Sequence, residues 1–172
     1  KTNLDDVAIA ASIINLQSGT LIEDHDAAVL AAFQRYSNKT DSIENISSYL
    51  SSMNEEQLVG ITANVKGILH EMEYVKLENE DGDSITAALF LDTNHKGFDV
   101  ILSDTNTGEL LDIQLKATDS SSYVQEWMDK YPEDEILVTK ELAEKMDIKS
   151  SGISNEDVTI KVEDFIDGIL QH

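Results

Sequence analysis

The chain has 172 residues, 41% of them hydrophobic and 27% charged, which is the composition of a soluble globular protein with one sizeable core or two small ones. The absence of cysteine excludes disulfide bonds, thiolate zinc sites and cysteine catalysis. The formal net charge of −22 disfavours tight, non-specific binding of nucleic acid, because phosphate contacts need a basic surface.

Neither a membrane span nor a signal peptide is predicted. No apolar run reaches the roughly 18 residues that a spanning helix needs, and the apolar stretch 7–14 lacks a basic flank and a cleavage site. Because the chain begins at Lys1, we expect a fragment or a processed chain, so that a targeting or membrane segment could lie outside it. For the given sequence itself we expect a cytoplasmic location.

Residues 1–53 are predicted to form a helical N-terminal segment, because their apolar side chains recur at helical spacing. Asp24 or Asp26 could cap the second helix, which ends at Tyr36. The expected helices cover 4–17, about 24–36 and about 42–52.

A fourth helix, capped by Ser52 or Asn54, carries a good apolar stripe. Near Tyr74 the period of the apolar residues changes from 3.6 to two, which predicts a strand over 74–77. An Asp-Gly dipeptide between this run and 85–91 is typical of a β-hairpin.

Further strands and helices follow in the same region. The order from helix to final strand predicts an α/β (α+β) fold with a mixed sheet and helices packed against it. The expected elements are strands 98–102 and 110–116, a helix from about 119–122 to before Pro132, a strand 136–138 and a helix 141–146. We expect a core over 54–146 and a C-terminal extension over 147–172, with a strand over 158–162 followed by a helix.

Polar residues on the predicted strands form a candidate site. Along one strand Asp112, Gln114 and Lys116 alternate with apolar residues and therefore share one face. Asp99 lies between two apolar residues of the neighbouring strand, where a carboxylate is costly unless it is paired or bound to a metal.

The pattern of these residues resembles the PD-(D/E)XK nuclease superfamily over roughly residues 55–140. The resemblance rests on Glu71 in the first helix, Asp99 after Gly-Phe on a strand, and Gln-x-Lys, ending at Lys116, on the next strand. The order of elements agrees with the αβββαβ, restriction-endonuclease-like core of that superfamily. Gln114 stands where Asp or Glu is commoner, and Phe98 replaces the proline of the family name.

The resemblance implies a metal-dependent nuclease, a hydrolase that binds DNA or RNA and cleaves phosphodiester bonds with Mg²⁺ or Mn²⁺. Asp99 and Gln114 would hold the ion, and Glu71 would complete the metal site. Lys116 would activate the attacking water and stabilise the developing charge. Glu73 competes with Glu71, because the end of the helix is uncertain by a few residues. The domain could be a module of a larger bacterial protein.

Three other interpretations stay open. In one, Asp99, Asp112 and Lys116 form a buried ion pair in a sheet without catalytic function. In another, the fold is kept but serves as an acidic binding or assembly module whose surface docks a basic protein partner. In the third, which rests on charge alone, the acidic face mimics DNA. Near the site, His70 is expected on a helix surface.

Tyr123 and Trp127 lie four residues apart on one predicted helix. Such spacing places both rings on one face of the helix. We therefore expect both to pack in the core.

Overall fold

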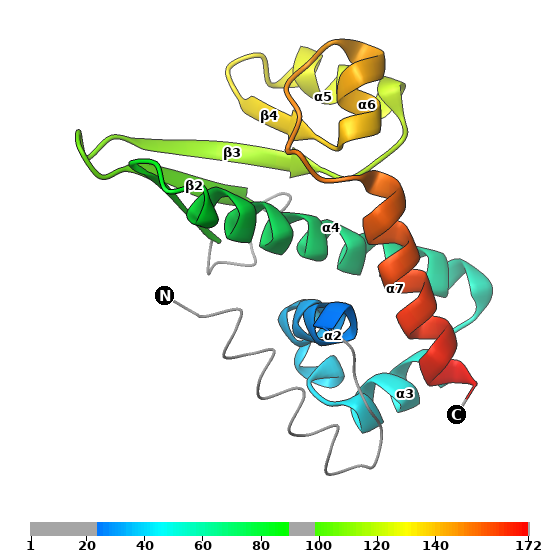
Figure 1. Cartoon of the computed structure of the whole chain (residues 1–172). Coiled ribbons are helices and arrows are strands. Elements are labelled where there is room, and N and C mark those ends of the chain that lie inside the picture. Colours follow the sequence, from blue (N-terminus) through cyan, green and yellow to red (C-terminus); the bar gives the residue numbers. More distant parts are fainter. Residues whose placement is uncertain (1–23, 90–98, 172) are drawn as a thin grey trace. The chain divides into compact units, whose positions relative to one another are not determined.

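The computed structural model describes residues 24–89 and 99–171, with the side chains of Asp24, His25 and Asp99 outside the description. The helix predicted over 4–17 therefore lies outside the described residues. Over these ranges the protein is α+β, with six α-helices and one four-stranded mixed sheet (Figure 1). The chain divides into two units, one comprising Lys1–Leu69 and Val158–His172 and the other His70–Asp157. We call them unit 1 and unit 2.

Unit 1 is helical in its described part. The first described helix, α2 (Asp24–Tyr36), is buried without interruption from Val29 to Phe33. The ring of Phe33 lies 5.5 Å from that of Phe165, and the Thr40 hydroxyl donates a 2.6 Å hydrogen bond to the Phe33 carbonyl. Its elements are α2 (Asp24–Tyr36), η1 (Asn38–Thr40), α3 (Ile43–Ser51), the first part of α4 (Glu55–Glu80) and most of α7 (Asn155–Leu170).

The capping residue of α4 is Asn54, whereas Ser52 ends α3. The Asn54 side chain accepts from the Gln57 amide at 2.8 Å, and the Gln57 side chain accepts from the Asn54 amide at 3.0 Å. This reciprocal pair satisfies two backbone donors that the first turn of a helix leaves open.

Unit 2 is built on the sheet, whose strand order is β1-β2-β3-β4. The first three strands pair antiparallel, whereas β4 pairs parallel with β3. A parallel pair needs a crossover connection, which α5 supplies. The elements are β1 (Ile85–Leu89), β2 (Asp99–Asp104), β3 (Leu110–Lys116), α5 (Ser121–Lys130), β4 (Glu135–Val138) and α6 (Lys140–Met146).

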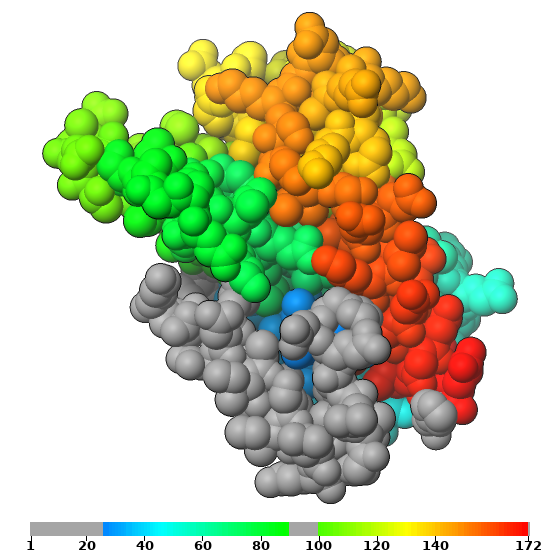
Figure 2. Space-filling model, in the orientation of Figure 1, coloured from blue at the N-terminus to red at the C-terminus, as the bar shows by residue number. Residues whose placement is uncertain are grey.

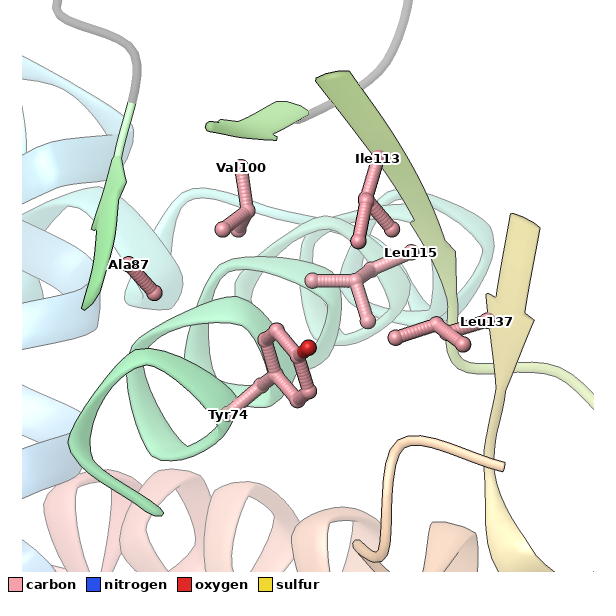
Figure 3. Close-up of a cluster of buried hydrophobic side chains, with 6 residues drawn as sticks. All are labelled: Tyr74, Ala87, Val100, Ile113, Leu115 and Leu137. Carbon is pink, nitrogen blue, oxygen red and sulfur yellow. The ribbon is translucent and has the colours of Figure 1, made fainter. Parts of the chain in front are cut away.

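Helices of unit 2 cover both faces of the sheet. Leu137 and Val138 are neighbours in β4 and face opposite sides, so they belong to different apolar clusters. The cluster of Leu137 lies between α4 and the sheet (Figure 3), and that of Val138 lies under α5 and α6. The surface of this part of the chain is coloured from yellow to orange in Figure 2. The first cluster comprises Tyr74, Ala87, Val100, Ile113, Leu115 and Leu137.

The strand predicted over 74–77 is wrong, because α4 continues to Glu80. Tyr74 is buried on the helix side that faces the sheet. Near the end of the helix, Asn79 donates to the Ala87 carbonyl at 3.0 Å and accepts from the Ala87 amide at 2.7 Å. The predicted hairpin turn is therefore a turn from a helix into β1.

The strand predicted over 158–162 is also wrong, because this stretch lies inside α7. Val158, Val162, Phe165 and Ile166 are buried, and their spacing of four, three and one is that of a helix face. Burial of this face outweighs the strand preference of the β-branched run.

Replacing Leu115 by Ala tests the packing between α4 and the sheet. Leu115 is 5% exposed, so we expect a loss of about 2–5 kcal/mol in the free energy of unfolding, measured with urea. The control is Leu111→Ala in the same strand, where a side chain 47% exposed should cost no more than about 0.5 kcal/mol. Equal losses in the two variants would contradict the described packing.

Candidate functional site

The four predicted site residues all belong to unit 2. Asp99 is the first residue of β2, and the register of the sheet places it directly opposite Gln114 of β3. Gln114 and Lys116 lie two residues apart in the same strand and share a face. Glu71 comes from α4, which covers the other side of the sheet through Tyr74.

Two of these residues are buried charges. Among the Asp, Glu, Lys and Arg side chains that the structure describes, only Glu71, 3% exposed, and Lys116, 9% exposed, are buried. Ionisable side chains of these types are rarely buried unless a partner compensates the loss of water, and neither residue is without a partner. Two of the four predicted site residues are therefore the charged side chains whose burial costs the most free energy in the described part of the chain.

The position of Glu71 in α4 follows from the helix period. Glu71 lies three residues before Tyr74 and therefore on the same side of the helix, one turn away. Tyr74 packs against Ile113 and Leu115 of the sheet. Because α4 runs past both candidates, the end of the helix does not decide between Glu71 and Glu73. The burial of Glu71 and the partial exposure of Glu73 favour Glu71.

Lys116 ends β3 on the side of the sheet that α5 covers. Its ammonium lies 3.9 Å from the centroid of the Trp127 ring and 5.8 Å from that of Tyr123. Ser120 caps α5 by accepting from the Tyr123 amide, which fixes the first turn of the helix that carries both rings. Tyr123 is 46% exposed, so the expectation that it packs in the core is wrong.

Asp112 does not join the buried charges. Its side chain is exposed, although it lies on the same strand as Gln114 and Lys116. The interpretation in which Asp112 is part of a buried ion pair is therefore wrong.

His70 is fully buried, so the expectation of a surface histidine is wrong. Its Nε2 atom lies 2.6 Å from the hydroxyl oxygen of Ser151, which is also buried. The Ser151 amide donates to the Val138 carbonyl at 2.8 Å. This hydrogen bond therefore ties α4 to the segment that follows α6.

Three carboxylates, Glu78, Asp81 and Asp83, form a cluster at and just after the end of α4. The sequence did not predict this cluster, because its Asp-Gly dipeptide favours a hairpin turn at the same place. One ligand atom from each residue lies within 4.8 Å of the others, and carboxylate oxygens suit Ca²⁺ or Mg²⁺. Burial, then the charges of Asp81 and Asp83, raises the pKa of Glu78. Burial first, and then the three carboxylates, raises the pKa of Tyr74 to about 12.

Comparison with protein-family models, curated proteins and solved structures finds no match to this chain. Among the helices of the described residues, none combines the length and the apolar character needed to cross a membrane. Function is therefore inferred from the burial, register and charge of the residues themselves.

The titration of Tyr74 tests the electrostatics of the carboxylate cluster. Because the folded pKa is raised from 10.0 to about 12, the neutral phenol contributes stability fully below pH 10 and loses it as the pH rises through 12. Ultraviolet titration should show a tyrosinate step near pH 12 that Tyr74→Phe removes. In Glu78→Gln the step should move down but stay above pH 10, since burial remains; an unmoved step would contradict the effect of the charges.

Removal of the Ser151 hydroxyl tests the buried hydrogen bond to His70. We expect Ser151→Ala to lower the free energy of unfolding by about 1–3 kcal/mol, because the buried ring nitrogen loses its bond without gaining water. Urea unfolding measures the change, and Ser150→Ala at an exposed neighbour is the control. If both variants unfold alike, the bond contributes nothing specific.

Proposed function

We propose that unit 2 is a metal-dependent nuclease-like domain of the PD-(D/E)XK type, which hydrolyses phosphodiester bonds. The observation that carries the proposal is the burial of Glu71 and Lys116, since the family pattern assigns both to the site. A carboxylate and an ammonium are costly to bury, and side chains of these types are almost never fully buried without a partner or a role that compensates the cost.

The element order of unit 2 supports the same proposal. A helix, three antiparallel strands, a helix and a parallel strand follow one another from α4 to β4. This is the order of the αβββαβ, restriction-endonuclease-like core. The register between Asp99 and Gln114 further supports it, because two metal ligands on neighbouring strands need to lie side by side.

The donor set fits a hard divalent cation. Asp99 and Gln114, which lie directly opposite each other on β2 and β3, offer oxygen atoms, which Mg²⁺ and Mn²⁺ prefer. Glu71 offers a further carboxylate from α4, the helix that covers the other face of the sheet. When bound, such an ion polarises the phosphate and lowers the pKa of a bound water.

The chain's own residues supply the other components of the reaction. Lys116 carries its ammonium in a site with little water, where it acts more strongly on a negative charge than it would in solvent. It balances the charge that develops on the phosphate and orients the attacking water. Gln114, being an amide, adds no negative charge that would repel the substrate.

A specific observation favours a second candidate, an acidic binding or assembly module. Apart from Glu71, every carboxylate side chain that the structure describes is exposed or half-buried. With a net charge of −22, this surface would attract a basic protein partner and repel nucleic acid.

Cleavage of plasmid DNA and of total RNA in Mg²⁺ or Mn²⁺ tests the nuclease proposal. We expect Asp99→Asn and Lys116→Met to lower the rate by about a hundredfold or more, since one removes a metal ligand and the other the stabilising charge. Asp112→Asn is the matched control, because it changes an exposed carboxylate in β3 and should leave the rate close to that of the wild type.

A well-folded wild type that cleaves neither nucleic acid would count against the nuclease. If, in addition, neither metal raised its melting temperature, the binding module would be the better proposal, because a specific ligand stabilises the state that binds it.

A further inference from the structure

Catalytic use of Lys116 requires its ammonium to stay in one place. A lysine side chain has four rotatable carbons and a point charge that fits many positions, so strand geometry alone does not fix it. Site groups must be held within about 0.5 Å of their working position. The residues that hold the ammonium are therefore part of the site, although they do not touch the substrate.

Trp127 is placed to do this. The Lys116 ammonium lies 3.9 Å from its ring centroid, against 5.8 Å for Tyr123. Tryptophan gives the strongest cation–π attraction of the aromatic side chains, and the attraction grows when water is excluded, as it is around the buried lysine.

Trp127 is itself held in position. The Tyr131 ring lies with its centroid 4.6 Å from that of Trp127, and the Tyr131 amide donates to the Trp127 carbonyl at 2.8 Å. The two rings are tilted by 46°, and the Trp127 ring links α5 to Lys116, the last residue of β3.

The chemistry of this contact suits a site lysine. An aromatic ring attracts the charge through its face and takes none of the three donors. The contact with the Trp127 ring therefore places the ammonium without using any of its N–H donors.

We propose that Trp127 is a positioning residue, which fixes the Lys116 ammonium by a cation–π contact and so makes α5 part of the site. The inference rests on the proposed nuclease function for its catalytic consequence. The contact itself does not depend on that function and has its own readout.

The contact is tested by a double-mutant cycle with Trp127→Leu and Lys116→Met, followed by urea unfolding. We expect a coupling of about fivefold to thirtyfold in the unfolding equilibrium constant. The matched control is Tyr123→Leu, one helical turn earlier and farther from the ammonium, which should couple to Lys116→Met less strongly. Trp127 is the only tryptophan of the chain, so Lys116→Met should also shift the fluorescence of the folded protein.

The catalytic consequence is tested by cleavage kinetics. Trp127→Leu should lower kcat by about tenfold or more with little change in KM, because a misplaced charge no longer meets the transition state. Trp127→Phe, which restores a ring face, should recover part of the loss. If Trp127 had only a structural role, Trp127→Leu would lower stability without lowering kcat selectively over KM. In that case Trp127→Phe would also not recover activity.

The outcomes separate the two proposals. Absence of coupling between Trp127 and Lys116 overturns the positioning role, whether or not the wild type cleaves nucleic acid. An unchanged kcat in Trp127→Leu also overturns it, while the nuclease stands. Coupling in a wild type that cleaves nothing supports the placement of the ammonium by Trp127 and overturns the nuclease alone.

Discussion

Unit 2 buries a carboxylate, Glu71, and an ammonium, Lys116, and the helices on the two faces of its sheet must exclude water from them. Glu71 enters from α4 on one side of the sheet, and Lys116 ends β3 under α5 on the other. Each charge costs several kcal/mol to bury before its partners compensate it. The Trp127 ring of α5, 3.9 Å from the Lys116 ammonium, is one of the groups by which the fold holds this charge.

The arrangement explains why a chain with net charge −22 can still be considered for phosphate chemistry. A bulk acidic surface weakens long-range attraction to nucleic acid, which depends on the overall field and on salt. Chemistry depends on the local field, where a desolvated ammonium acts over a few ångströms. The acidic overall surface and the local positive charge of Lys116 are separate properties. The local charge supports the nuclease, and the acidic surface supports the binding module.

Much of the fold could be predicted from the sequence, because its signals are local. The alternation from Leu110 to Lys116 predicted β3, and the serines before Tyr123 predicted the start of α5. The predictions failed where tertiary contacts override local preference. At Tyr74 an apparent period of two is a helix face against a sheet, and at Val158 a β-branched run is the buried side of α7.

The residues of the candidate site could be chosen from the sequence, but their environments could not. The alternation placed Gln114 and Lys116 on one face, yet nothing in it indicated that Trp127 would cover Lys116 while Asp112 stayed exposed. His70 and Ser151 are 81 residues apart in sequence, so no local pattern could join them. The burial of Lys116 depends on how α5 packs back onto the sheet, and the pairing of His70 depends on where the segment after α6 returns.

The paired hydrogen bonds between Asn79 and Ala87 have a consequence for self-association. Both backbone groups of Ala87 are bound by one side-chain amide, which imitates the neighbour that an edge strand otherwise lacks. An open edge of this kind recruits strands from other molecules and leads to domain swapping or fibrils. Among the described residues β1 is an edge strand, and Asn79 of α4 occupies the outward backbone groups at its middle, so that a strand of another molecule cannot pair there.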